Sequence, residues 1–236
     1  MHRCNLHRRN TAKTLVAGVI AVAVFLLISL GLTSCSTKGS VMDAAQHTPH
    51  DIERLTLQQQ FELYAQRYER AQQVMSASQL QVAGPEVEWQ WISAGIAPSQ
   101  GHLAPIPLQG ATAQNSYFLL VSRSLDRAQV SNEVDVIEHM RDFFHKLGWH
   151  VRAGQLSNVP SLEAVTDEGP VVHLDQQPSG QLNLTVIAGP YWGDTSNLLN
   201  AIVTRIPPKN LGTQSSTPGN YTEFPLWSDP IENLKR

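Results

Sequence analysis

The sequence predicts an α+β fold, in which two or three helices pack on one face of a mostly antiparallel sheet. In the segments 51–81 and 131–147, apolar residues recur at three- and four-residue spacing, which is typical of amphipathic helices. Short segments of alternating or wholly apolar residues, bounded by turn signals, are typical of strands. The chain has no internal repeat, and these elements indicate a single domain over residues 51–208.

The first residues have the layout of an export signal. Residues 1–13 are basic and carry no carboxylate, and residues 15–32 are apolar and uncharged. Residues 32–35 read Leu-Thr-Ser-Cys and resemble the lipobox of bacterial lipoproteins. The resemblance implies a signal peptide over 1–34 and a diacylglyceryl group on Cys35, whose two acyl chains hold a protein firmly at a membrane. The alternative is an uncleaved transmembrane anchor, because the apolar run is close to the ~18 residues that span a bilayer.

Removal of the signal changes both cysteine usage and charge. The chain has two cysteines, Cys4 and Cys35, so the folded domain has no disulfide and no thiol chemistry. The formal net charge of −3 becomes −7, since 13 basic and 20 acidic residues are left. A mildly acidic domain argues against a nucleic-acid partner and against a polybasic membrane-binding surface. The expected contact with the membrane is the lipid on Cys35, which places the domain on the outer face of the cytoplasmic membrane.

The first part of the exported chain predicts a tether and then a helix. Residues 35–50 are small and polar and are expected to form a flexible, lipidated tether. From about Asp51 to Gln81 one helix is expected, ended by Pro85. Its apolar face consists of Leu57, Phe61, Tyr64, Tyr68, Ala71 and Met75.

The middle of the chain predicts two strands, a long loop and a helix. Residues 87–93 alternate as a strand that places Trp89 and Trp91 on one face, and residues 117–122 form a second strand that is buried on both faces. Between them, residues 94–112 form a long loop with three prolines and three glycines. The helix 131–147 follows, with Ser131 as the expected N-cap and Gly148 as the stop.

The remaining elements are short. Strands are expected over 149–153, 161–166, 171–174 and 181–188. A third helix, 195–205, is capped by Asp194 or Thr195 and stopped by Ile206-Pro207-Pro208. Residues 209–236 are rich in Pro, Gly and Ser and form a tail, either loose or laid back over the domain.

The segment 187–208 contains a Trp-Gly-Asp step that leads into a short helix ending in Ile-Pro-Pro. This segment, the long first helix and the stretch from Phe143 to Trp149 resemble uncharacterised actinobacterial lipoproteins of the LppA-like kind. The resemblance covers roughly residues 51–208, although many such lipoproteins carry a cysteine pair in the domain and this chain has none. It implies a location and a fold, and no established activity.

Familiar catalytic signatures are absent from the sequence, including the Gly-x-Ser-x-Gly, His-Glu-x-x-His, P-loop and Gly-x-Gly-x-x-Gly patterns. One set of residues has the chemistry of a metal site. Glu138, Asp142 and His145 share a face of the helix 131–147, and two carboxylates with an imidazole can bind a divalent metal. The alternative is a solvated face, on which Arg141 and Lys146 partner the carboxylates.

Two groups of aromatic residues are candidates for binding. Trp192 and Asp194 stand at a strand-to-helix corner, where they either present an edge to a ligand or fill the corner and cap the helix. Trp89 and Trp91 form either a binding stripe or part of the core. His102 and His173 are isolated in the sequence and are not expected to be ligands.

Three functions are compatible with these features. The first is a non-catalytic binding or scaffold module of the cell envelope, whose partner is an envelope protein or ligand and which needs no cofactor. The second is a metal-dependent envelope hydrolase that uses Glu138, Asp142 and His145. The third is a small solute-binding lipoprotein, although receptors with two lobes generally need a longer chain than this.

Overall fold

The computed structural model describes residues 41–130, 135–156, 159–207 and 214–231. Within them, an antiparallel sheet of eight strands packs with four α-helices, so the predicted α+β fold is confirmed. The predicted signal peptide and Cys35 lie outside the described residues.

The helices are α2 (Pro49–Glu53), α3 (Leu57–Ala83), α4 (Val136–Lys146) and α5 (Thr195–Val203), with 3-10 turns η1 (Gly101–Leu103) and η2 (Arg127–Gln129). The strands are β1 (Trp89–Ala94), β2 (Ser99–Gln100), β3 (Ser116–Asp126), β4 (His150–Leu156), β5 (Val159–Val165), β6 (Val171–Gln176), β7 (Gln181–Trp192) and β8 (Ser215–Ser216).

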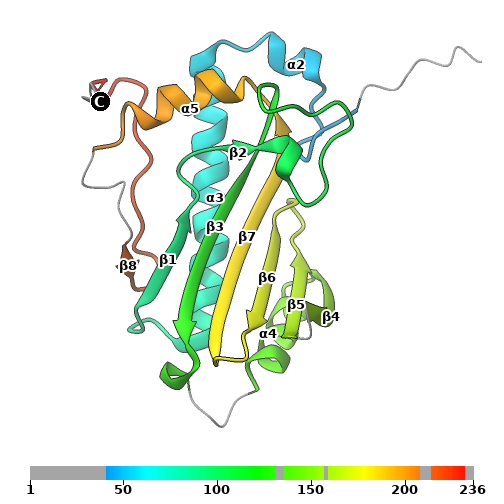
Figure 1. The fold of residues 1–236 in the computed structure, drawn as a ribbon, viewed down its shortest axis with the longest axis vertical. Coiled ribbons are helices and arrows are strands. Elements are labelled where there is room, and N and C mark those ends of the chain that lie inside the picture. Colours follow the sequence, from blue (N-terminus) through cyan, green and yellow to red (C-terminus); the bar gives the residue numbers. More distant parts are fainter. Residues whose placement is uncertain (1–40, 131–134, 157–158, 208–213, 232–236) are drawn as a thin grey trace, which may run out of the picture. The chain divides into compact units, whose positions relative to one another are not determined.

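The sheet is built around the two longest strands. Its order is β4-β5-β6-β7-β3-β1-β8, and β2 pairs with β3 beside this path. The strands β4 to β7 form an antiparallel meander that returns to β3, and β7 pairs with β3 from Gln181↔Asp126 to Trp192↔Ser116. This long pairing connects the two ends of the domain (Figure 1).

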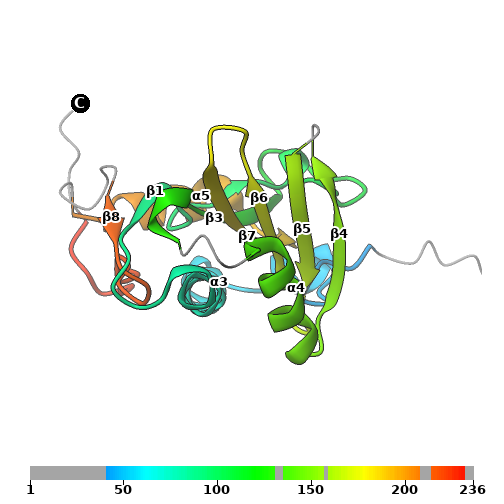
Figure 2. The same ribbon diagram turned by 90° about the horizontal axis from the view of Figure 1, so that it is seen from below.

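The helices α3 and α4 cover the same face of the sheet (Figure 2). On β7, Leu182, Leu184 and Val186 are fully buried towards the helices, while the residues between them are only partly buried. Strands alternate the direction of their side chains, so this pattern follows from the sequence QLNLTVIA, as predicted. The helix α5 packs against the N-terminal part of α3.

The predicted helix 51–81 is wrong at its start, because the structure has two helices there. Thr48 caps α2 and Thr56 caps α3, each within a capping box, and Thr56 has an extended backbone that breaks the helical run. The helix α3 ends at Gly84, whose φ is +79°, before Pro85 is reached.

The helix predicted over 131–147 begins later than expected. Its N-cap is Asp135, whose side chain accepts hydrogen bonds from Ile137 N and Glu138 N. The expected cap, Ser131, lies outside the described residues. Gly148, with φ +81°, follows the end of the helix as predicted.

The predicted tail and part of the predicted tether both pack on the domain. In the tail, β8 pairs with β1, and Tyr221, Phe224 and Trp227 pack against the core. At the other end of the chain, Asp43 is buried and α2 begins at Pro49. The tether 35–50 was therefore predicted too long, because residues from 41 onward contact the domain.

The core consists of two clusters. The first, which we call the aliphatic cluster, lies between the sheet, α4 and the C-terminal half of α3, and its buried members include Met75, Met140, Phe144, Leu174 and Leu184. The second, which we call the aromatic cluster, lies under α5 and the N-terminal half of α3, and its buried members include Phe61, Tyr64, Tyr68, Tyr117 and Tyr191.

Candidate functional site

The corner that follows β7 is built by backbone hydrogen bonds across the sheet end. Gly193 N donates to Asn115 O at 3.0 Å, and Thr195 N donates to Gln114 O at 2.8 Å. The side chain of Asp194 accepts from Asn197 N at 3.2 Å and so caps α5. Asp194 is therefore the helix cap, as predicted. Both of its carboxylate oxygens accept hydrogen bonds from Asn197 in the first turn of α5.

Glycine is required at position 193 because the ring of Tyr117 lies against it. A Cβ atom there would be 2.6 Å from Tyr117 Cε1, which is closer than packed carbon atoms approach. The Trp-Gly-Asp step thus has a structural reason, namely that the backbone crosses an aromatic ring before α5 begins.

The first described residues hold Trp192 in place through hydrogen bonds. Its backbone N–H donates to Asp43 Oδ2 at 3.1 Å, and its indole N–H donates to Val41 O at 3.0 Å. The other carboxylate oxygen of Asp43 accepts from Ala45 N and His47 N at 2.8 and 2.9 Å. This long-range contact fixes the point at which the chain enters the domain.

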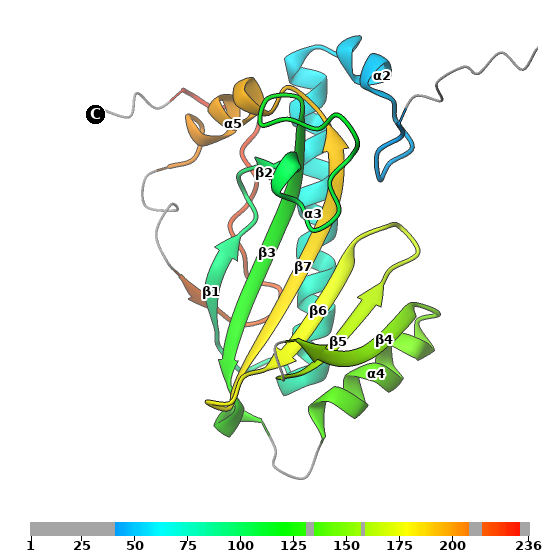
Figure 3. The same ribbon diagram turned by 45° about the vertical axis from the view of Figure 1, so that its right-hand side comes forward.

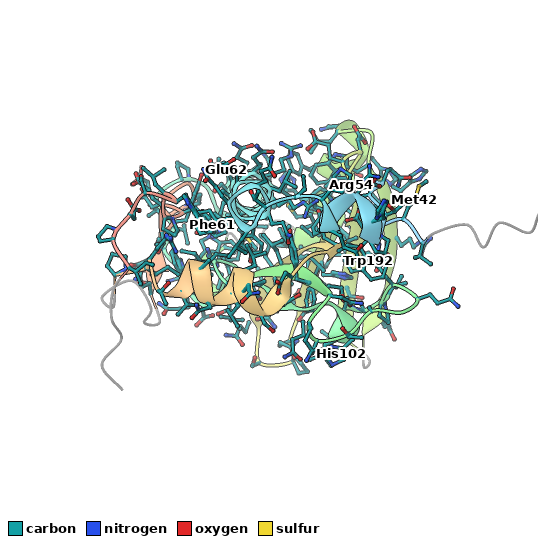
Figure 4. The ribbon with its side chains drawn as sticks, turned by 90° about the horizontal axis from the view of Figure 1, so that it is seen from above. Met42, Arg54, Phe61, Glu62, His102 and Trp192 are labelled. Atoms are coloured by element: carbon teal, nitrogen blue, oxygen red, sulfur yellow. The ribbon has the colours of Figure 1, made fainter. Side chains whose placement is uncertain are left out.

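Gln60 joins α3 to the corner. Its Oε1 accepts from Asp194 N at 2.9 Å, and its Nε2 donates to Leu55 O at 3.4 Å. One buried side chain therefore connects the turn between α2 and α3 to the start of α5. Figure 4 looks down on this end and shows Trp192 between Arg54 at the end of α2 and His102 on the loop that follows β2.

A groove of about 540 Å³ opens between these parts. Its walls come from α2, the turn after it, the start of α3, the end of the loop before β3 and the β7–α5 corner. It is lined by Pro49, Ile52, Glu53, Leu55, Leu57, Gln60, Gln114, Asn115, Trp192, Gly193 and Asp194. The volume is within the range of ~300–1,000 Å³ that is typical of small-molecule sites.

The lining has the chemistry of a binding site. Its side chains are apolar, amide or carboxylate, and none carries a hydroxyl, thiol, imidazole or amine. Apolar surface with a few placed polar groups gives a bound ligand both affinity and orientation. Of the predicted binding residues, the structure brings Trp192 and Asp194 to this groove.

Trp89 and Trp91 do not line the groove and belong to the core side of β1. Both side chains are buried, and Trp91 Nε1 donates to Ser216 Oγ at 2.8 Å. The guanidinium carbon of Arg123 lies 4.2 Å from the Trp91 ring centroid. Of the two predicted roles for Trp89 and Trp91, their burial therefore favours part of the core over an exposed binding stripe.

Sequence reasoning missed Arg123, which is 2% exposed in the middle of β3. Its Nη1 donates to Ser93 O at 2.6 Å and its Nη2 donates to Gln72 Oε1 at 3.2 Å. Burial lowers the pKa of the Arg123 guanidinium to about 10. The signal in the sequence is that Arg123 is the only charged residue in the strand sequence YFLLVSRSL.

The predicted metal face is a solvated helix face. Arg141 donates from Nη1 to Glu138 Oε1 at 3.0 Å, and its Nη2 lies 3.8 Å from Asp142 Oδ1. Among the residues that the structure describes, no three His, Cys, Asp or Glu side chains gather as a metal-holding group. Glu138, Asp142 and His145 therefore do not form the site that the hydrolase hypothesis needs.

The two histidines that looked isolated differ in their surroundings. His173 Nδ1 lies 3.8 Å from Glu163 Oε2 on the neighbouring strand, while His102 is exposed on η1. Neither of them lines the groove.

No helix within the described ranges is both long and apolar enough to cross a bilayer. The apolar run 15–32 lies outside those ranges. No family model, curated protein or solved structure matches this chain. The likeness to LppA-like lipoproteins is therefore carried by the short motifs of the sequence alone.

Proposed function

We propose that this chain is a lipid-anchored lipoprotein on the outer face of the cytoplasmic membrane, and that it is a non-catalytic binding or scaffold module of the cell envelope. The groove beside Trp192 would be its ligand site. The observation that supports binding most directly is the lining of that groove, where the apolar side chains of Ile52, Leu55 and Leu57 lie beside amide and carboxylate side chains. The lipobox sequence at Cys35 supports the anchor.

The groove suits a ligand that has an apolar part and a hydrogen-bonding part. Apolar side chains of α2 and α3 offer burial, while the exposed amide of Gln114 offers a donor and an acceptor at the rim. A segment of an envelope protein or a small neutral ligand has this character. The lining has carboxylates at Glu53 and Asp194 and no basic side chain, which disfavours anions.

The anchor is tested by the intact mass of the mature protein and of the Cys35→Ala variant. We expect cleavage before Cys35 and the added mass of a diacylglyceryl group, and we expect both to be lost in the variant. An unprocessed mass in both proteins would contradict lipidation and would favour the transmembrane alternative.

The binding site is tested by photo-crosslinking in cells, with a photoreactive residue placed at Gln114. This side chain is exposed at the groove, so the replacement leaves the fold intact. Gln81, exposed near the far end of α3, is the matched control. We expect a defined adduct from position 114 and none from position 81. Equal labelling at both positions, or none at either, would exclude the groove as the binding site.

A further inference from the structure

The loop between β2 and β3 displays apolar side chains that the core does not take up. Ile106 is 81% exposed and Leu103 is 66% exposed. Pro105 and Pro107, on either side of Ile106, are exposed as well. Exposed apolar side chains that occur singly are common, but this loop brings two large ones together within a short stretch.

The loop is held in place, so its exposed side chains are not a sign of loose chain. Its base pairs with the sheet, where Ser99 lies opposite Phe118 and Gln100 lies opposite Tyr117. Gly101 packs so closely on Ser116 that a Cβ atom would lie 2.6 Å from Ser116 Oγ. Near its far end, Asn115 Nδ2 donates to Gly110 O at 3.1 Å. The apolar tip is therefore fixed in an outward position.

The same stretch is without formal charge. No Asp, Glu, Lys or Arg occurs between Glu88 and Arg123, although 16% of the chain is charged. An exposed loop without charges can enter an interface of low polarity without the large cost of desolvating an ion.

The loop lies at the end of the domain where the chain enters it. Val41 O accepts from Trp192, Trp192 pairs with Ser116, and Gly101 packs on Ser116. Figures 1 and 3 both show the loop after β2 at the same end of the domain as the first described residues. Met42, beside this entry point, is 54% exposed and adds a third apolar side chain.

The sequence between the anchor and this entry point is short. Residues 36–40 alone separate Cys35 from Val41, and a fully extended chain covers at most ~3.6 Å per residue, or about 22 Å here. A domain anchored through Cys35 thus has this end within that distance of the lipid headgroups. Because the connecting segment 36–40 is short, the anchor keeps the apolar loop close to the membrane.

We propose that the loop carrying Leu103 and Ile106 rests on the lipid surface and fixes the orientation of the domain relative to the membrane. This inference rests on the proposed anchor at Cys35. The groove beside Trp192 is lined in part by the end of the same loop, at Gln114 and Asn115, so its mouth would lie close to the membrane surface. The ligand would then be taken from molecules at or near that surface.

The charged side chains on or beside α2 are two acidic ones, Asp51 and Glu53, and one basic one, Arg54. They give no attraction for anionic headgroups, so the contact depends on the apolar side chains of the loop. The lipid contact should therefore occur on zwitterionic as well as on anionic bilayers.

The test uses the full lipidated protein in vesicles of phosphatidylcholine, with and without phosphatidylglycerol. An environment-sensitive fluorophore is attached to Ile106→Cys and, as control, to Ser179→Cys in the exposed β6–β7 turn at the opposite end. We expect blue-shifted emission and quenching by doxyl lipids from position 106, and water-like emission from position 179. Water-like emission at both positions would overturn the proposal.

Two further variants separate a lipid contact from other causes. Leu103→Asp places a charge beside the label at position 106 and should return its emission to the water-like value, while Leu80→Asp, at an exposed position near the far end of α3, should leave it blue-shifted. A blue shift that grows with the ratio of protein to lipid would overturn the proposal in favour of contact between two copies of the chain.

Failure of the anchor is recognised independently. Vesicle flotation and intact mass are measured first, and a protein that neither floats nor carries the diacylglyceryl group contradicts the anchor at Cys35. A protein that floats but keeps a water-like label at position 106 contradicts the loop contact alone.

Discussion

The two core clusters are held together in different ways. The aliphatic cluster consists mainly of side chains from α3, α4 and the strands, so most of its members belong to regular elements. The aromatic cluster is closed by segments from the two ends of the described chain: Ala44 packs against it from the N-terminal end, and in the tail Thr222 O accepts from Tyr68 at 2.6 Å and Trp227 O accepts from Arg205 at 3.1 Å. The groove and the apolar loop both lie at the end of the aromatic cluster.

This difference indicates that the two clusters have different roles, one in stability and the other in positioning loops and chain ends. Close-packed apolar side chains give the aliphatic cluster its stability without any polar requirement. The aromatic cluster combines apolar bodies with polar ends, since Tyr64 donates to Gly95 O at 2.9 Å and Tyr117 accepts a hydrogen bond from Arg67. Such contacts fix the positions of loops and chain ends, which is what a binding end requires.

The largest effect is expected from Phe144→Ala in the aliphatic cluster. Phe144 is fully buried, and its ring is stacked on Trp149 at 5.2 Å between centroids. We expect a loss of about 3–5 kcal/mol in the free energy of unfolding, measured by urea denaturation. The comparison variant Phe224→Ala removes a half-buried ring that contacts Phe61 at 5.1 Å, and should cost clearly less. Equal losses would contradict the proposed difference between the clusters.

The next largest effect is expected at Asp43, where one carboxylate holds the first described residues to the end of β7. Asp43→Ala leaves the amides of Ala45, His47 and Trp192 without their acceptor, at a cost of about 2–3 kcal/mol. Hydrogen exchange should quicken at these three amides and stay unchanged in β5. The control Asp51→Ala removes the exposed N3 carboxylate of the capping box of α2, so its effect should be confined to α2. Faster exchange throughout the sheet would show that Asp43 supports the whole fold.

The contrast between the clusters also explains which features the sequence could predict. Periodicity identifies α3, α4 and the strands of the meander because each repeats a local pattern along one segment. The contact of Asp43 with Trp192 joins residues far apart in the chain and leaves no periodic trace. The same applies to β8 and to the aromatic residues of the tail, whose return to the core depends on tertiary packing. The break at Thr56 is different, because its capping-box residues Thr56 and Gln59 are visible in the sequence.

At the site, the sequence identified the corner and missed the groove. Trp192 and Asp194 stand next to each other in the sequence, so their turn and helix cap could be predicted from local rules. The opposite wall comes from Ile52 and Leu55, which become available to the groove because the helix is broken between α2 and α3. The prediction of one continuous helix over 51–81 therefore gave no indication that Ile52 and Leu55 line a groove.

An intermediate effect is expected from alkaline pH, and it should arise mainly in the aromatic cluster. Burial raises the pKa of Tyr117 to about 12 and also raises the pKa values of Tyr64, Tyr68 and Tyr191. The unfolded chain releases these phenol protons near pH 10, so the stabilisation present below pH 10 is lost as the pH rises towards 12. Arg123 acts in the opposite direction, because its lowered pKa makes deprotonation easier in the folded state. Four tyrosines outweigh one arginine, so stability should fall.

Urea denaturation at pH 8 and pH 11 measures this effect. We expect a lower free energy of unfolding at pH 11 than at pH 8, and we expect Tyr117→Phe to reduce that loss by about 1 kcal/mol. If Tyr117→Phe has the same pH dependence as the unchanged protein, the phenol of Tyr117 is not the group whose titration destabilises the fold.

The smallest effect is expected at Asp142 on the solvated face of α4. Its side chain is well exposed, and Arg141 Nη2 lies 3.8 Å from it while pairing more closely with Glu138. Exposed ion pairs contribute about 0–1 kcal/mol, so Asp142→Ala should change the free energy of unfolding by less than about 0.5 kcal/mol. Asp142→Ala leaves the closer ion pair between Arg141 and Glu138 in place. Glu138→Gln removes that closer pair, so it is the matched comparison and should cost slightly more.

Both variants should unfold identically with and without added Zn²⁺. A stabilisation by Zn²⁺ that is present in the unchanged protein and lost in Asp142→Ala would restore a metal role to this face, and with it the hydrolase hypothesis.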